Sequence, residues 1–313
     1  VCQHDGKLYG IPAYECFLRR GLNYNIKMIE DAGLDANKPP ETWDELFDWH
    51  EKLTKFDGAG NLQQIGIDPY DAEGGVGPGG DGWFMCESWD VDWFDMNSKE
   101  FHLNDERIAK GMEVMGEFVK LIGPDNLAGL RSVEGQGSWG GSFNAGIQAM
   151  IIEGYWHPGE TVAEKPEIAP FNRATWVPVP EERRGTKIQF GGGHMVQIYK
   201  DSKNKDLAFP IAEFLQSTAC NDIIFNNIGW LPAYKPYFEG ADPNKYPGLD
   251  FYFKSINEAN YWGKDIRCEI QSFVETKVGE AREKVFRGEM TGQAAADWLQ
   301  DQAITEWKQA GYG

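Results

Sequence analysis

The chain has 313 residues, of which 41% are hydrophobic and 25% charged, so it can bury a core and fold into two domains or one large one. Its net charge of −19 repels nucleic acids and anionic lipids, and we expect neither as a partner. No apolar run approaches the roughly 18 residues that a membrane span needs. The five dispersed cysteines include no Cys-x-x-Cys pair, and we expect no metal site and no cofactor.

Taken in chain order, short strands alternate with helices, which predicts the α/β class. Strands are expected at residues 8–12, 18–24, 64–67, 150–152, 175–180 and 190–196, with a polar hairpin at 181–186. The helix at 26–32 begins after Asn25 and ends at Gly33, and Thr42 with Glu45 forms a capping box before the next one. Apolar spacing predicts further helices at 108–122, 207–218, 270–278 and 291–303. Pro210 is expected in a first helical turn.

Residues 143–156 form the most informative stretch. A short amphipathic turn leads into the apolar run 150–152, and Glu153-Gly154 breaks that run before Tyr155 and Trp156. Side chains that follow a strand in an open α/β sheet face the crevice where ligands bind. Pro158 suits the first turn of a following helix. These two aromatic rings are therefore candidates for ligand contact, and the alternative is that they cap a core.

Tryptophan is abundant, and several indoles stand beside glycine, proline or aspartate rather than within apolar stripes. They are Trp83, Trp139, Trp156 and Trp230. Aromatic faces on loops stack well on sugar rings and on planar ligands. Ordinary burial in a core accounts for some of the twelve tryptophans.

Catalytic motifs are sparse. The sequence has no Gly-x-Ser-x-Gly elbow and no His-Glu-x-x-His, which argues against serine hydrolases and zinc proteases. Glu153 and Glu160 flank Trp156 and are the suspects for a glycosidase carboxylate pair. Solvated surface charge is the more ordinary interpretation of both.

The chain resembles the extracellular solute-binding proteins of ABC importers, the family that includes the maltose-binding protein. Residues 5–12 with 22–25 are similar to its crossover strand, and residues 32–46 to its most recognisable motif. Residues 143–156 are similar to its Phe-x-x-Gly-x-x-Ala-Met…Gly-x-Trp segment. Gly191–Gly193, the turn at 229–233 and the helix opening at 288–291 complete an ordered set that covers nearly the whole chain.

This resemblance implies a two-lobed periplasmic-binding-protein-like fold of type II, with solute held between lobes that close on binding. Residues 1–12 would end lobe one and form the hinge strand, 13–188 lobe two, 189–240 a return segment of lobe one, and 241–313 C-terminal helices mainly of lobe two. A signal peptide and most of lobe one precede the crossover strand in the family. We therefore expect lobe one to be incomplete here, with any lipid anchor on the missing N-terminal part.

The resemblance also implies the site residues. Trp156 would be the stacking platform, Tyr14 and Glu15 would line the hinge, and Gly192 and Trp230 would contribute from lobe one. Trp83 and Arg267 are assigned by approximate position.

The resulting hypothesis is a monomeric periplasmic or extracellular protein, not an enzyme, that binds a carbohydrate or sugar-like solute and delivers it to a membrane permease. The alternatives are a carbohydrate-active hydrolase with a carboxylate pair beside the tryptophans, and a purely structural surface protein.

Overall fold

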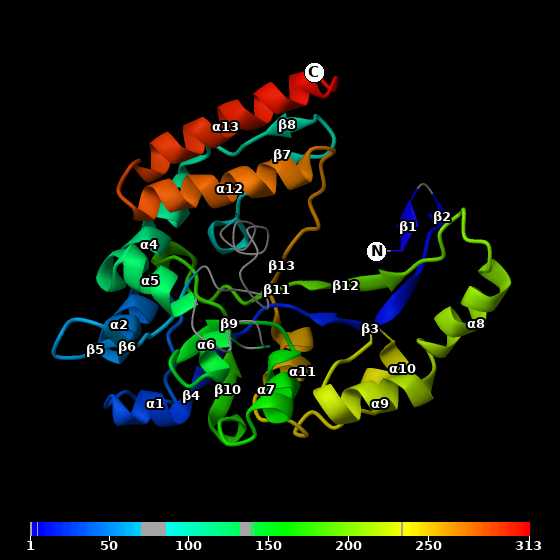
Figure 1. Cartoon of the computed structure of the whole chain (residues 1–313), viewed down its shortest axis with the longest axis horizontal. Coiled ribbons are helices and arrows are strands. Elements are labelled where there is room, and N and C mark those ends of the chain that lie inside the picture. Colours follow the sequence, from blue (N-terminus) through cyan, green and yellow to red (C-terminus); the bar gives the residue numbers. More distant parts are fainter. Residues whose placement is uncertain (1, 5, 70–85, 132–138, 140, 233) are drawn as a thin grey trace.

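The computed structural model describes residues 2–4, 6–69, 86–131, 139, 141–232 and 234–313, and its helices and strands alternate as the sequence predicts (Figure 1). The strands are β1 (Gln3–His4), β2 (Lys7–Leu8), β3 (Ile11–Leu18), β4 (Leu22–Asn25), β5 (Lys55–Phe56), β6 (Leu62–Gln64), β7 (Phe94–Asp95), β8 (Glu100–Phe101), β9 (Met150–Ile152), β10 (Asn172–Thr175), β11 (Ile188–Gln189), β12 (Gly191–Val196) and β13 (Tyr261–Trp262). The helices are α1 (Ile26–Asp31), α2 (Trp43–Leu53), α4 (Glu106–Ile122), α5 (Pro124–Arg131), α6 (Gly141–Asn144), α7 (His157–Glu164), α8 (Lys205–Phe214), α9 (Thr218–Ile228), α10 (Lys235–Phe238), α11 (Leu249–Glu258), α12 (Gln271–Phe286) and α13 (Gly292–Gln309).

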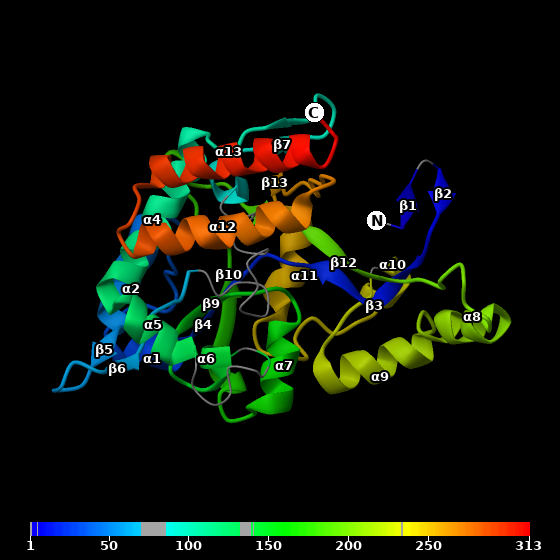
Figure 2. The ribbon, with the colours of Figure 1, turned by 45° about the horizontal axis from the view of Figure 1, so that its top comes forward.

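Most of the chain forms one large body around a continuous apolar core. Its central sheet has the order β10-β4-β9, and both neighbours run antiparallel to β4. Helices α12 and α13 lie side by side and pack against α4 (Figures 1 and 2). Fully buried members of this core come from both halves of the sequence, as Leu22, Ile65, Val119 and Leu299 illustrate. The C-terminal helices therefore belong to the same body as β4.

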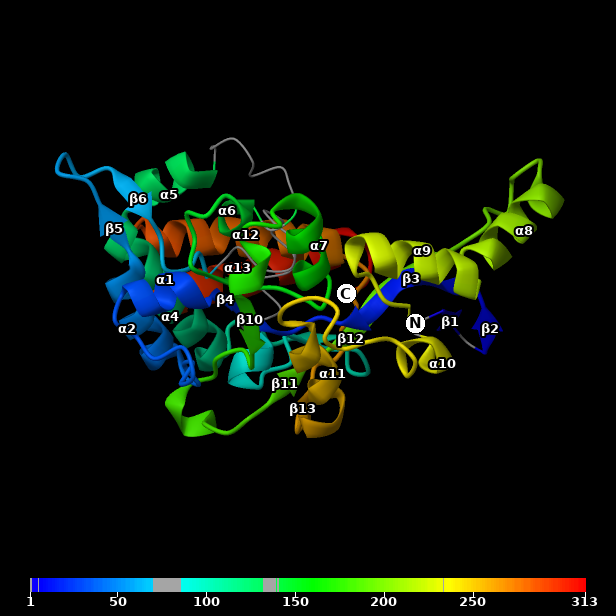
Figure 3. The same cartoon turned by 90° about the horizontal axis from the view of Figure 1, so that it is seen from below.

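A two-stranded ribbon leads out of this body. Strands β3 and β12 pair antiparallel, with Gly192 opposite Phe17. The ribbon carries β1, β2 and α8 at its far end, and α9 and α10 lie along it (Figures 1 and 3). A second apolar cluster lies at its base, where Phe17, Tyr155, Phe225 and Leu231 meet. On α8, by contrast, the large apolar side chains are exposed, Leu207 by 72% and Ile211 by 62%.

Local hydrogen bonds explain why several elements begin where the sequence predicts. Asn25 Oδ1 accepts from the backbone N–H groups of Lys27 and Met28 and so caps α1. Thr42 Oγ1 accepts from Glu45 N at 3.3 Å, and the Glu45 carboxylate reaches back to Glu41 N. The predicted capping box is thus present, although its return bond ends one residue before the cap.

Other boundaries differ from the expectation. The strand expected at 18–24 starts only at Leu22, and the one expected at 175–180 is β10, which ends at Thr175. The prediction of a hairpin at 181–186 is wrong, because residues Glu181–Arg183 form a short 3-10 helix. Pro210 lies inside α8 rather than in its first turn. Tyr14 and Glu15 lie within β3, not beyond it, because the crossover strand runs on to Leu18.

Gly159 permits a close helix contact at the base of the ribbon. A Cβ at this position of α7 would lie 2.3 Å from the carbonyl oxygen of Ile228, at the end of α9. We expect Gly159→Ala to lower the free energy of unfolding by about 1–3 kcal/mol, because backbone must move apart. Gly129 is the control, since a Cβ on α5 meets nothing within 4 Å and alanine there favours the helix. Urea unfolding that ranks Gly129→Ala as the more damaging change would contradict this packing.

Within the described ranges, no helix is both long and apolar enough to cross a membrane.

Candidate ligand-binding site

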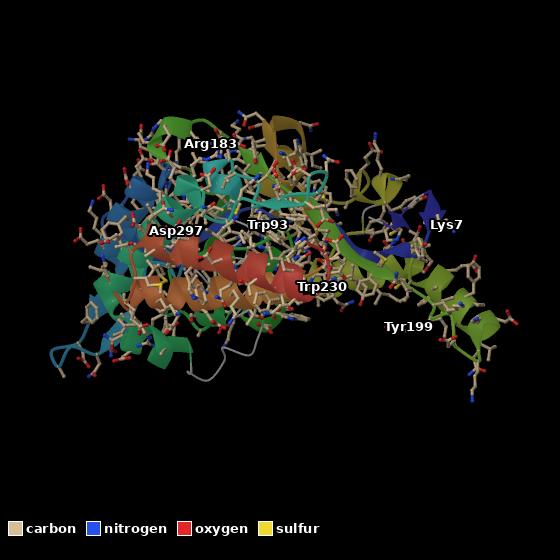
Figure 4. The ribbon with its side chains drawn as sticks, turned by 90° about the horizontal axis from the view of Figure 1, so that it is seen from above. Lys7, Trp93, Arg183, Tyr199, Trp230 and Asp297 are labelled. Atoms are coloured by element: carbon tan, nitrogen blue, oxygen red, sulfur yellow. The ribbon has the colours of Figure 1, made fainter. Side chains whose placement is uncertain are left out.

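A cavity of about 390 Å³ lies beside the ribbon, where β12 passes the end of β3 and the loop before α12. Its aromatic lining comes from Trp93, Phe190 and Tyr261. Basic and acidic groups are equally represented in the remaining wall, as Arg19, Arg20, Lys264 and Arg267 against Glu87, Asp92, Asp265 and Glu275. Figure 4 shows Trp93 near the middle of the molecule, away from Lys7 and Tyr199 at the far end of the ribbon. The cavity wall is therefore largely polar, with three aromatic side chains among its lining residues.

Glycine brings the β12 backbone to the cavity wall. A Cβ on Gly192 would lie 2.8 Å from the Phe190 ring and 3.2 Å from the Arg19 side chain, so neither neighbour could keep its place. Arg19 N donates to Phe190 O at 2.9 Å, which joins the ends of the two strands here. Gly192 thus lets a cationic side chain and an aromatic ring share one wall.

Most cations of the cavity are already paired. Arg20 donates to Glu87 through two bonds, Nε to Oε2 at 2.5 Å and Nη2 to Oε1 at 3.0 Å. Lys264 pairs with Asp92 at 2.5 Å, and Arg267 pairs with Asp265 at 2.6 Å. The wall therefore offers donors and acceptors without a strong excess of either charge.

Trp156 is buried, with 6% of its surface exposed. Its Nε1 donates to Glu153 Oε2 at 2.7 Å, and the Arg19 guanidinium lies 4.9 Å from the centre of its ring. The space beside it is closed, because a Cβ on Gly154 would fall 2.2 Å from the indole. Arg19 lines the cavity and covers this indole, so Trp156 supports the wall from behind.

Tyr14 and Trp230 form a second aromatic group outside that lining. Their rings stack with centroids 6.0 Å apart and 6° between planes, and Trp139 packs against Trp230 at 5.4 Å. Trp230 Nε1 donates to Glu160 Oε1 at 2.8 Å. Trp230 lies toward the base of the ribbon in Figure 4, and the pair links β3 to the turn after α9.

The expectation that Glu153 and Glu160 are solvated surface charges is wrong. Glu153 is 1% and Glu160 4% exposed, because both are covered by indoles that donate to them. Burial, with smaller contributions from Glu164 and Glu15, raises the pKa of Glu160 to about 8. Neither carboxyl belongs to the cavity lining.

The raised pKa of Glu160 predicts a pH dependence of stability. Above its ordinary value of 4.5 the unfolded chain has released this proton while the folded protein still holds it. The group's contribution is therefore complete below that value and is lost as the pH rises toward about 8, by about 1.4 kcal/mol per pH unit. We expect the difference in unfolding free energy between wild type and Glu160→Gln to follow this slope in urea titrations. A pH-independent difference would show that Glu160 is ionised when folded.

Two buried histidines change the free energy of unfolding with pH in the opposite direction to Glu160. The measured quantity is therefore the difference between wild type and Glu160→Gln at each pH. Burial lowers the pKa of His50 to about 4 and that of His157 to about 3. The unfolded chain binds their protons below about pH 6.5, which removes stability as the pH falls. Comparing Glu160→Gln with wild type cancels this contribution because both proteins keep the two histidines.

The seven predicted site residues thus fall into groups. Gly192 and the exposed Arg267 line the cavity, Trp156 lies behind Arg19, and Tyr14 stacks on Trp230. Glu15 is 7% exposed and reaches the cavity only through His194, whose Nδ1 lies 2.6 Å from its Oε2. Trp83 lies outside the described residues. Sequence reasoning missed Arg19, Arg20, Glu87, Trp93, His194 and Tyr261, although the Arg-Arg pair directly after β3 is a signal that strand-end reasoning could have used.

Thiols and carboxylates do not converge on a metal position among the described residues. Cys2, Cys86, Cys220 and Cys268 are free thiols. Burial raises the pKa of Cys268 to about 11, which keeps it protonated and unreactive at neutral pH.

Comparison with known proteins identifies similar molecules. The family model of bacterial extracellular solute-binding proteins matches residues 3–219. The structure of CpMnBP1 with mannobiose bound superposes with a TM-score of 0.81 at 19% identity, over 96% of this chain and 73% of the other. The maltose/maltodextrin-binding domain MalE from Bdellovibrio bacteriovorus, bound to maltotriose, gives 0.71 at 18% identity over 98% and 74%. An ABC transporter solute-binding protein from Agrobacterium vitis S4, with bound D-mannitol, gives 0.72 at 20% identity over 99% and 75%. At these identities the likeness establishes the two-lobed periplasmic-binding-protein fold; the incompleteness of lobe one stays a prediction.

Proposed function

Because the chain belongs to the bacterial extracellular solute-binding proteins, we propose that it binds an uncharged saccharide or polyol in the cavity beside the ribbon and delivers it to an ABC importer. Members of this family bind substrates and are not enzymes, and an extracellular family fits a periplasmic or extracellular location. The proposal includes a monomer, and a lobe division in which residues 1–12 and 189–240 belong to lobe one, and 13–188 with most of 241–313 to lobe two. The separate position of α8–α10 on the ribbon supports that division.

The ion pairs in the cavity wall favour an uncharged solute over a phosphate. Three of its cations have a carboxylate within 2.6 Å, so a phosphate would have to compete with an existing partner. Hydroxyl groups can instead accept from guanidinium or ammonium groups and donate to carboxylates without separating any pair. Trp93 and Tyr261 supply faces on which a sugar ring can stack. Sugar-bound structures of similar fold lend further support.

A thermal-shift series tests this choice of solute. Mannobiose, D-mannitol, ribitol and D-tagatose are compared with mannitol 1-phosphate at equal concentration, since a ligand that binds only the folded state raises the melting temperature. We expect a neutral member to stabilise the protein and the phosphate to do so less. A larger shift with the phosphate would overturn the neutral-solute proposal, and no shift across a wide neutral panel would overturn sugar binding.

The positions of Glu153 and Glu160 do not support the alternative that the protein is a glycoside hydrolase. Glu153 and Glu160 are each held by an indole N–H and are absent from the cavity lining. A pair that attacks a glycosidic bond must flank the substrate. We therefore propose binding and transport alone for this site.

A further inference from the structure

An irregularity in the ribbon lies beside the cavity. The pairing of β12 with β3 jumps from Gly193 opposite Cys16 to Met195 opposite Pro12, so residues 13–15 of β3 stand against His194 alone and His194 has no partner residue in the ladder. The extra residues belong to β3, and such a bulge bends the strand and re-aims its side chains, among them Glu15. His194 Nδ1 lies 2.6 Å from Glu15 Oε2 across the two strands, and His194 is among the residues that line the cavity.

The two members of this pair differ sharply in exposure. The Glu15 side chain is 10% exposed and the His194 side chain 80%. Tyr155 Oη, at 3.5 Å, is a distant second partner for the carboxylate, so His194 is its main one. The buried Glu15 carboxylate is thus hydrogen-bonded to the exposed imidazole of His194, which lines the cavity.

Hydrogen-bond chemistry then fixes the roles of the two ring nitrogens. An ionised carboxylate only accepts, so Nδ1 must carry the hydrogen, and in a neutral ring Nε2 is left as an acceptor. In the described part of the chain no hydrogen bond engages Nε2. The acidic side chains Glu87, Asp92 and Asp265 of the same wall already accept from Arg20, Lys264 and Arg267. In its neutral form, His194 therefore adds an acceptor without such a partner.

We propose that His194 is a solute-contacting residue whose Nε2 accepts a hydroxyl hydrogen of the bound saccharide, and that Glu15 is a positioning residue that holds the Nδ1–H tautomer. This inference rests on the proposed function, and it gives Glu15 a role through His194 instead of direct contact with solute. The arrangement favours ligands with a free hydroxyl at the contacted position, because an O-methyl group has no hydrogen to donate.

The tautomer is measured directly by 15N NMR of the histidine-labelled full chain at pH 8, with the His194 signal identified from its loss in His194→Gln. We expect a pyrrole-type Nδ1 and a pyridine-type Nε2 in the free protein. Glu15→Gln should retain this pattern, since its amide oxygen still accepts, whereas Glu15→Leu should lose it. A predominant Nε2–H tautomer in wild type overturns the proposal, whether or not any sugar binds.

The solute contact is tested with the neutral probe that gives the largest melting shift, beginning with mannobiose. We expect saturation to move the Nε2 resonance, and His194→Phe to weaken binding about tenfold in calorimetry, the size of one neutral hydrogen bond. His102→Gln is the control, because His102 bonds the carbonyl oxygen of Asp92 and does not line the cavity. Calorimetric binding with an unmoved Nε2 resonance and unchanged affinity of His194→Phe overturns the contact. If no probe binds, the proposed function is refuted. The NMR measurement of the His194 tautomer then still tests whether Glu15 holds the Nδ1–H form.

Discussion

Replacing Arg20 by leucine is expected to lower the free energy of unfolding by about 3–5 kcal/mol, the usual cost of leaving one member of a buried ion pair without its partner. The side chains of Arg20 and Glu87 are 4% and 9% exposed, and two hydrogen bonds join them. On one side Gly263 closes the space around Glu87, because a Cβ there would fall 2.3 Å from its Oε1. Urea unfolding monitored by tryptophan fluorescence measures the loss.

Arg184→Leu is the matched control for this prediction. Arg184 contacts three carboxylates, Glu41, Glu45 and Glu181, but its side chain is 39% exposed and water can replace each partner. We expect the control to lose far less stability than Arg20→Leu. The double variant Arg20→Leu/Glu87→Leu should recover much of the loss, since no charge is then left buried. Equal losses at Arg20 and Arg184 would contradict the account of the buried pair.

Trp156→Ala is expected to lower the free energy of unfolding by about 3–5 kcal/mol, as for other large aromatic side chains in a core. The change leaves a cavity beside Tyr155, removes the N–H that Glu153 accepts from, and removes the ring beneath Arg19. Thermal and urea unfolding measure it. Weakened sugar binding by this variant alone would not assign the indole to the solute, because the whole wall changes.

Trp156→Phe separates the two roles of the indole. Phenylalanine keeps an aromatic face beneath Arg19, so we expect sugar affinity to fall by no more than about tenfold. A loss of more than about a hundredfold in a well-folded Trp156→Phe variant would mean that the indole meets the solute itself.

Elements governed by neighbouring residues were predictable from the sequence. Helix α4 has buried residues at Ile108, Met112, Met115 and Val119, the spacing from which it was predicted, and Gly123 after it has a positive φ of 82°. The prediction of a short strand at 150–152 with Pro158 in the next helix is confirmed by β9 and α7. These signals arise within one or two helical turns, so the sequence order alone contains them.

Most of the site depends on contacts between distant residues, which local patterns do not report. Arg20 meets Glu87 across 67 positions, and His194 meets Glu15 across 179. The burial of Glu160 likewise depends on Trp230, 70 positions away. The family resemblance named Gly192 and Arg267 as site residues, and both line the cavity. It could not indicate that Arg19 would cover Trp156.

A crystal structure with the neutral sugar that gives the largest melting shift tests the central claim most directly. The chain offers a second hollow of about 510 Å³, lined by Trp49, Trp176 and Arg184 on another face, which serves as an internal comparison. We predict sugar density beside the ribbon, against Trp93, Tyr261 and His194. Density in the second hollow with an empty cavity at the ribbon would contradict the account.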